Sequence, residues 1–171
     1  MPDMAERPLL FLDVDGPLLP FGGAPQPGSR HVAQDSHLAR LNPEVGRRLA
    51  ALSCELVWAT AWEDAANTEI APRLGLPPLP VISWPDSSDV REREDDWFGL
   101  CWKTRFLVDW AAGRPFIWID DEITCADQDW VSAHHPGRAL LHHVESFRGL
   151  ADDDFAALDE WLRRGVAPHG V

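Results

Sequence analysis

The chain has 171 residues and a mass of 19.1 kDa, which predicts one compact domain over residues 1–171. Hydrophobic residues make up 45% and charged residues 25%, a balance that excludes disordered, collagen-like and low-complexity architectures. The formal net charge of −13 argues against a nonspecific nucleic-acid binder, because such a surface repels phosphate backbones, but it is compatible with an enzyme that has a local positive site.

The first predicted element is a strand over residues 8–15, an apolar run that is nearly continuous until its carboxylates and is typical of a parallel sheet buried on both faces. Residues 20–36, dense in Pro and Gly, predict a loop. A helix over residues 42–52 follows, with Asn42 as its cap and Pro43 at its first position.

The middle of the chain continues this alternation. Residues 55–60 predict a second buried strand, and residues 63–74 predict a helix that stops at Gly75. Residues 81–84 predict a short third strand. Residues 85–97, rich in Asp and Glu, predict an acidic, solvated loop.

The last third predicts an amphipathic helix over residues 102–112, a fourth strand over 116–120, a fifth strand over 139–144 and a final helix over 152–163. Strands that alternate with helices indicate an α/β fold, a three-layer α/β/α sandwich with a parallel, Rossmann-like sheet. In such sheets, ligands bind beyond the carboxyl ends of the strands.

Reactive side chains follow three of the predicted strands. Asp13 and Asp15 follow the first strand, Thr60 follows the second, and Asp120 and Asp121 follow the fourth. Alternation in an extended strand puts the first two carboxylates on the same side. Clustered carboxylates repel one another unless a cation or a proton lies among them, and Mg²⁺ prefers such oxygen ligands. These carboxylates favour a site for Mg²⁺ where the first and fourth predicted strands end.

Lysine usage singles out one further position. The chain has fourteen arginines but a single lysine, Lys103, at the start of a predicted helix. Arg and Lys are not interchangeable where a compact point charge is needed. We therefore expect Lys103 to meet a phosphate and to offset the carboxylates.

The cysteines and the apolar runs indicate in which cellular compartment the protein is expected. Cys54, Cys101 and Cys125 are scattered without zinc-site spacing, which favours free thiols in a reducing environment. No apolar run approaches the ~20 residues of a membrane span, and no signal peptide is recognisable at the start. We expect a cytoplasmic protein that does not cross a membrane.

Four segments resemble, in order, the four motifs of the haloacid dehalogenase-like (HAD) superfamily: Asp13-Val14-Asp15-Gly16, Thr60 after an apolar strand, Lys103, and Ile119-Asp120-Asp121. The segment Leu56-Val57-Trp58-Ala59-Thr60-Ala61-Trp62 is similar to the small HAD domains of Swiss Army Knife RNA repair proteins. The resemblance implies the HAD fold. It also implies phosphoryl chemistry, because the second Asp of the last motif separates HAD phosphatases from dehalogenases.

The resemblance further implies a role for each residue. Asp13 would be the nucleophile that forms an aspartyl-phosphate, and Asp15 the general acid and base. Thr60 and Lys103 would bind the phosphoryl oxygens. The implied Mg²⁺ ligands are the Asp13 side chain, the Asp15 main-chain carbonyl and Asp120, with Asp121 in or next to the coordination sphere. The candidate substrate-binding residues border these positions: Gly16, Ala61 and Trp62.

The chain departs from the family pattern at Pro17, where Thr or Val is common, so the loop has one N–H fewer for a phosphate. Residues 17–41 and 85–100 are too short for a folded lid, so we expect no sizeable cap domain. In the superfamily an open site goes with large substrates such as proteins or polynucleotides, although oligomerisation could also cover it. The acidic net charge argues mildly against polynucleotides.

These observations favour a Mg²⁺-dependent phosphomonoester hydrolase acting on a phosphorylated substrate of open identity. The alternatives are a polynucleotide end-processing phosphatase and a non-catalytic binding module; the filled catalytic positions argue against the module. The oligomeric state stays open. So does the question of whether Asp121, Asp127 or Asp129 supplies a further metal contact.

Histidines are not expected to bind a metal. Six of them lie in predicted loops or on the last strand: His31, His37, His134, His135, His142 and His143. Those in the first loop are expected to be solvated, with substrate contact as the alternative. Adjacent strand positions such as 142 and 143 face opposite ways, which argues against a shared ion. Trp62 and Trp97 form a candidate stacking platform for a base or ring.

Overall fold

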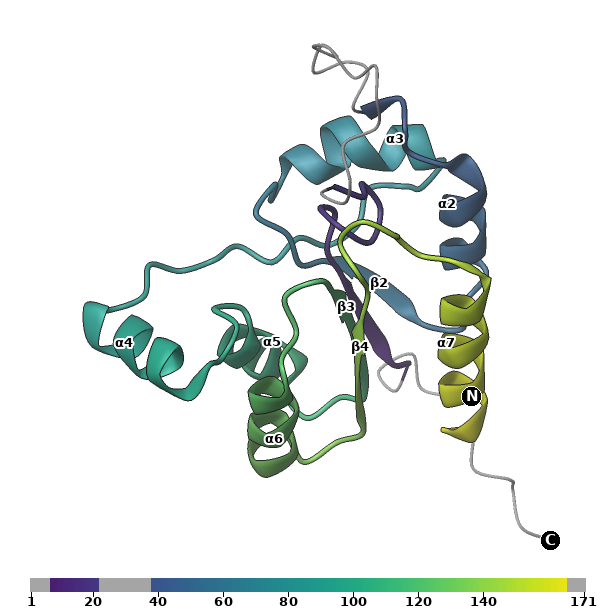
Figure 1. Cartoon of the computed structure of the whole chain (residues 1–171). Helices are drawn as coiled ribbons and strands as arrows, with labels where there is room; N and C mark the ends of the chain where they lie inside the picture. The colour runs from purple at the N-terminus through teal and green to yellow at the C-terminus, as the bar shows by residue number, and fades with distance from the viewer. Residues whose placement is uncertain (1–6, 22–37, 166–171) are drawn as a thin grey trace, which may run out of the picture.

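A computed structural model describes residues 7–21 and 38–165 of the chain (Figure 1). Within them, four parallel strands form one sheet in the order β2-β1-β3-β4. The strands are β1 (Leu9–Leu12), β2 (Glu55–Trp58), β3 (Phe116–Asp120) and β4 (Ala139–His143). The predicted parallel α/β sheet is confirmed, with β1 and β3 at its centre.

The helices follow local sequence rules. The Asn42 side chain caps the first of them by accepting a hydrogen bond from the Glu44 main-chain N–H at 3.0 Å. The helices are α2 (Pro43–Ala50), the π-helical turn η2 (Ala66–Ile70) that continues into α3 (Ala71–Leu74), α4 (Asp89–Phe98), α5 (Thr104–Ala111), α6 (Cys125–His134) and α7 (Asp152–Arg164).

Helices cover both faces of the sheet (Figure 1). Successive strand residues face opposite sides, so Leu10 and Leu12 of β1 pack in a core with α2, α3 and α7. Leu9 and Phe11 pack in a second core with α5 and α6. This arrangement confirms the three-layer sandwich and buries the central strands on both sides, as their continuous apolar sequence predicted.

The prediction of an acidic loop over residues 85–97 is wrong, because helix α4 occupies most of this segment. Ser88 caps this helix by accepting a hydrogen bond from the Arg91 N–H, and Asp89 and Glu92 lie in its first turn, where the helix dipole favours negative charge. Gly99, with φ of 72°, ends it in a left-handed conformation. Figure 1 shows α4 outside the three layers, beside α5.

Helix α6 is an element that the sequence analysis does not predict. Thr124 and Asp127 start it with a capping box, in which each side chain accepts a hydrogen bond from the other residue's main-chain N–H.

The third strand predicted over residues 81–84 shrinks to a single bridge between Trp58 and Val81. The Trp58 N–H donates to the Pro80 carbonyl at 2.9 Å, and the Ile82 N–H donates to the Trp58 carbonyl at 3.0 Å. Pro80 precedes this contact and has no N–H to donate, so the pairing does not extend toward the N-terminal side.

The three cysteines are free, as expected; Cys54 and Cys101 are buried and Cys125 is exposed. In the described parts of the chain, no helix is both long and apolar enough to cross a bilayer. The predictions for His31 and His37 lie outside the described residues.

Candidate active site

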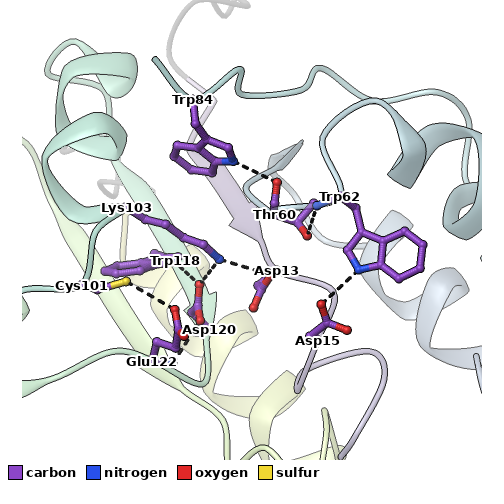
Figure 2. A network of polar contacts seen from close by, with 10 residues as sticks. All are labelled: Asp13, Asp15, Thr60, Trp62, Trp84, Cys101, Lys103, Trp118, Asp120 and Glu122. Atoms are coloured by element: carbon purple, nitrogen blue, oxygen red, sulfur yellow. Dashed lines mark hydrogen bonds and ion pairs between the residues drawn. The ribbon is translucent and has the colours of Figure 1, made fainter. Parts of the chain in front are cut away.

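Three neighbouring strands bring their carboxyl ends to one edge of the sheet. Because β1 lies between β2 and β3, Asp13 after β1 lies between Thr60, which follows β2, and Asp120, the last residue of β3. Lys103, at the start of α5, reaches the same edge, and Asp15 lies beside it (Figure 2). The structure thus brings the residues of all four predicted motifs together.

Lys103 is the centre of this site. Its ammonium lies 2.7 Å from Oδ2 of Asp120 and 3.2 Å from Oδ1 of Asp13, and the residue is only 2% exposed. Burial alone would lower its pKa, but attraction to Asp120 and Asp13 outweighs burial and leaves the pKa above its ordinary value. The lysine is therefore a fixed positive charge between two carboxylates.

The carboxylates of this edge are crowded. Burial raises the pKa of Asp13 to about 8, against the attraction of Lys103 and with the help of repulsion from Asp120. Burial, with contributions from Asp120, raises the pKa of Asp121 to about 6. Both shifts arise mainly from burial, and the neighbouring Asp120 adds to them, so a further positive charge in this site would favour the ionised carboxylates.

The geometry of these carboxylates suits a divalent cation. Oxygens of Asp13, Asp120 and Asp121 all lie within 4.8 Å of one another. Hard carboxylate oxygens are the ligands that Mg²⁺ prefers. The Asp15 side chain does not belong to this group, and the metal contact of its main-chain carbonyl stays a prediction.

Asp120 is held from several sides. Its Oδ2 accepts hydrogen bonds from Lys103 and from the Trp118 indole N–H, the latter at 3.2 Å. Its Oδ1 accepts from the Glu122 main-chain N–H at 3.0 Å. These contacts fix the carboxylate in one orientation, as a metal ligand requires.

Asp127 and Asp129, the other two candidates for a further metal contact, have different surroundings. Asp127 is buried, and its oxygens accept from the Cys101 N–H, the Thr104 hydroxyl and Thr124, so it joins α6 to the start of α5. Asp129 is exposed on α6. Asp121 is therefore the one of the three that the geometry groups with Asp13 and Asp120.

Asp15 and Trp62 form a pair that the sequence did not reveal. The Trp62 indole N–H donates to Oδ2 of Asp15 at 3.0 Å, and its main-chain N–H donates to the Thr60 hydroxyl oxygen at 3.2 Å. The Thr60 hydroxyl thus keeps its own hydrogen for another acceptor. Ala61, between them, is exposed. The structure thus places Trp62 against the predicted acid, and its contact with substrate stays a prediction.

Gly16 is needed for close approach. Its φ is +101°, and a Cβ added there would lie 2.9 Å from Cγ of Asp121. Its N–H donates to the Leu19 carbonyl at 3.0 Å, within a tight turn. The absence of a side chain at Gly16 thus lets the first motif lie against Asp121 of the last motif. The Gly16 N–H already donates a hydrogen bond to Leu19.

Three of the candidate histidines in the described residues have separate partners, whereas the ring nitrogens of the buried His135 have none there. His134 contacts the Trp130 carbonyl, His142 contacts Asp154, and His143 contacts the Asp121 carbonyl. Trp97 lies on α4 and is 85% exposed, and Figure 1 shows α4 well apart from α3, the helix that follows Trp62 in the chain. The structure therefore does not join Trp62 and Trp97 into one platform.

Sequence reasoning missed Trp118, Trp84 and Glu122, which border the site. Strand alternation could have found Trp118, because it precedes Asp120 by two residues in β3. The Trp84 indole N–H donates to the Thr60 carbonyl at 2.9 Å, a contact that no local pattern indicates.

Comparison with known protein families finds a match that covers most of the chain. Residues 9–155 match the family described as the HAD domain in Swiss Army Knife RNA repair proteins. Neither a curated protein nor a solved structure matches the chain.

Proposed function

The chain belongs to the family of HAD domains in Swiss Army Knife RNA repair proteins, and on this basis we propose that it is a Mg²⁺-dependent phosphomonoesterase that works through an aspartyl-phosphate. The observation that carries the proposal is the buried contact of Lys103 with Asp13 and Asp120. A phosphoryl group bound beside this cation would meet a carboxylate nucleophile and a partner for its own negative charge.

In the proposed first step, a carboxylate oxygen of Asp13 attacks the phosphorus, and the bond from phosphorus to the ester oxygen breaks. Asp15 donates its proton to that oxygen, so the leaving group departs as a neutral alcohol. The Thr60 hydroxyl and the Lys103 ammonium stabilise the charge on the phosphoryl oxygens.

In the second step, Asp15 accepts a proton from a water molecule whose oxygen attacks the phosphorus. The bond between Asp13 and phosphorus breaks, which releases inorganic phosphate and restores the Asp13 carboxylate. The Trp62 indole, bonded to Oδ2 of Asp15, keeps this carboxylate oriented in both steps.

The residues that would hold Mg²⁺ are Asp13, Asp120 and Asp121 through their side chains and Asp15 through its carbonyl, the last by resemblance alone. When bound, Mg²⁺ supplies positive charge that offsets the phosphoryl oxygens and the crowded carboxylates.

A second candidate is a phosphatase that processes the ends of RNA or DNA. The description of the matched family favours it, and the net charge of −13 weighs against it. A phosphorylated oligonucleotide and the corresponding nucleoside monophosphate, compared at equal ionic strength, separate the two candidates. A higher kcat/KM for the oligonucleotide favours end processing.

The direct test is hydrolysis of an aryl phosphate with Mg²⁺ and with a chelator. We expect turnover that requires Mg²⁺ and is lost in Asp13→Asn. The matched control is Asp129→Asn, which removes an exposed carboxylate on α6 and keeps activity. Activity that survives chelation, or that persists in Asp13→Asn, contradicts the proposal. Mg²⁺ binding without turnover on any phosphomonoester favours the non-catalytic module.

A further inference from the structure

A pocket of about 800 Å³ lies beside the candidate active site, against helix α4. Glu92, Asp95 and Asp96 of α4 form one of its walls. Trp102, just before α5, and Phe106 within it form another. None of the proposed catalytic steps uses this pocket.

Two residues that line the pocket form hydrogen bonds with residues of the candidate active site. Trp84, one of its lining residues, donates to the Thr60 carbonyl at 2.9 Å. Glu122, another, donates its main-chain N–H to Asp120 at 3.0 Å. Figure 2 shows Trp84 joined to Thr60, and Glu122 next to Asp120. The part of a substrate that lies beyond its phosphoryl group can therefore extend toward this pocket.

Aromatic rings gather on one side of the pocket. The rings of Trp84 and Trp102 meet edge to face with centroids 4.8 Å apart, and the Phe106 ring lies 6.0 Å from that of Trp84. Trp102 is 42% exposed although it is a large apolar side chain. Such a surface favours a flat or apolar group that covers the exposed ring.

The charged side chains that line the pocket are all acidic. Five carboxylates line it: Asp86, Glu92, Asp95, Asp96 and Glu122. Arg105 pairs with one of them, Asp95, at 2.7 Å, and the other four form no ion pair within the described residues. The lining includes no lysine or arginine, although the Arg91 guanidinium lies over the Phe106 ring at 5.0 Å. The pocket therefore repels anions and attracts cations.

We propose that this pocket is the leaving-group subsite, and that it selects phosphomonoesters whose leaving group is aromatic and positively charged over those that carry further negative charge. The inference rests on the proposed function and narrows its substrate class. It disfavours a polynucleotide, whose neighbouring phosphates would face these carboxylates.

The test uses three aryl phosphates that differ in one para substituent: aminomethyl, hydroxymethyl and carboxymethyl. The methylene group keeps the phenolic oxygens similar, so kcat/KM reports mainly charge recognition. We expect the aminomethyl ester to exceed the carboxymethyl ester by about tenfold at low ionic strength, and this ratio to shrink with added salt. The double variant Glu92→Gln, Asp96→Asn should reduce the ratio. The matched control, Asp159→Asn with Glu160→Gln on α7, removes the same charge elsewhere and should leave the ratio unchanged.

Turnover of all three esters at similar kcat/KM, or a ratio that both double variants change equally, overturns the subsite and leaves the proposed function standing. Absence of turnover for all three contradicts the proposed function. In that case, calorimetric titration of the wild-type protein with the corresponding phenols still decides the subsite. Tighter binding of the aminomethyl phenol, weakened by the α4 variant, supports it, and equal binding overturns it.

Discussion

Trp62 holds the proposed acid in place through one hydrogen bond. Its indole N–H reaches Asp15, while its main-chain N–H reaches Thr60, so the residue fixes two motifs at once. A carboxylate that must give and then take a proton needs a constant orientation toward the ester oxygen. In the proposed mechanism, Trp62 therefore acts through Asp15, as a positioning residue.

Replacing Trp62 by Phe keeps most of the ring and removes this donor. We expect kcat to fall about tenfold for esters with poor leaving groups, because a hydrogen bond to a charged group is lost. Esters with good leaving groups, which need little protonation, should lose much less, and KM should change little. The measurement is kcat across a series of leaving groups. Trp110→Phe, on α5 and outside the site, is the control; an equal loss for all esters indicates a structural role instead.

At the scale of elements, helix α6 depends on its cap. The Thr124 hydroxyl oxygen accepts from the Asp127 N–H at 3.2 Å, and the hydroxyl donates to the Gly99 carbonyl at 2.9 Å, at the end of α4. One side chain thus starts α6 and ties it to α4.

Thr124→Ala should lower the free energy of unfolding by about 1 kcal/mol, the usual loss for a removed helix cap. Thr124→Ser keeps the hydroxyl and should recover most of that loss. Urea denaturation measures both variants. A serine variant as unstable as the alanine variant would show that the methyl group, rather than the hydroxyl, stabilises this junction.

Some contacts between elements could be predicted from the sequence, and others could not. Asp13, Thr60 and Asp120 could be predicted to meet, because parallel strands bring their carboxyl ends to one edge. Helix α4 was missed because its polar composition hid the cap at Ser88 and the stop at Gly99. The bond between Trp62 and Asp15 joins two loops that follow different strands, and no periodicity encodes it.

The free energy of unfolding of the whole molecule depends on pH through the carboxyl groups of this site. A carboxyl whose pKa rises from 3.8 to about 8 on folding, as for Asp13, holds its proton in the folded state at pH values where the unfolded chain has released it. The folded state then binds more protons, so this contribution to stability falls as pH rises between those values. Asp121, with a pKa raised to about 6, acts in the same direction over a narrower range.

In the presence of a chelator, we therefore expect the wild-type protein to lose stability relative to Asp13→Asn as pH rises from about 4 to 8. Urea denaturation of both proteins across this range gives the difference, in which the contributions of other groups largely cancel. Added Mg²⁺ should stabilise the wild type more at the upper end, where the carboxylates are ionised. A difference between the two proteins that is independent of pH contradicts the raised pKa of Asp13.

The central claim is that Asp13 carries the phosphoryl group, and trapping that intermediate tests it most directly. Asp15→Asn removes the base of the second step, while an aryl phosphate with a good leaving group still allows the first. After incubation with Mg²⁺ and acid quenching, intact-mass analysis should show one added phosphoryl group, and peptide mapping should assign it to Asp13. The double variant Asp13→Asn, Asp15→Asn should show none. A phosphoryl group on another residue, or an unmodified Asp15→Asn protein alongside an active wild type, would contradict the mechanism.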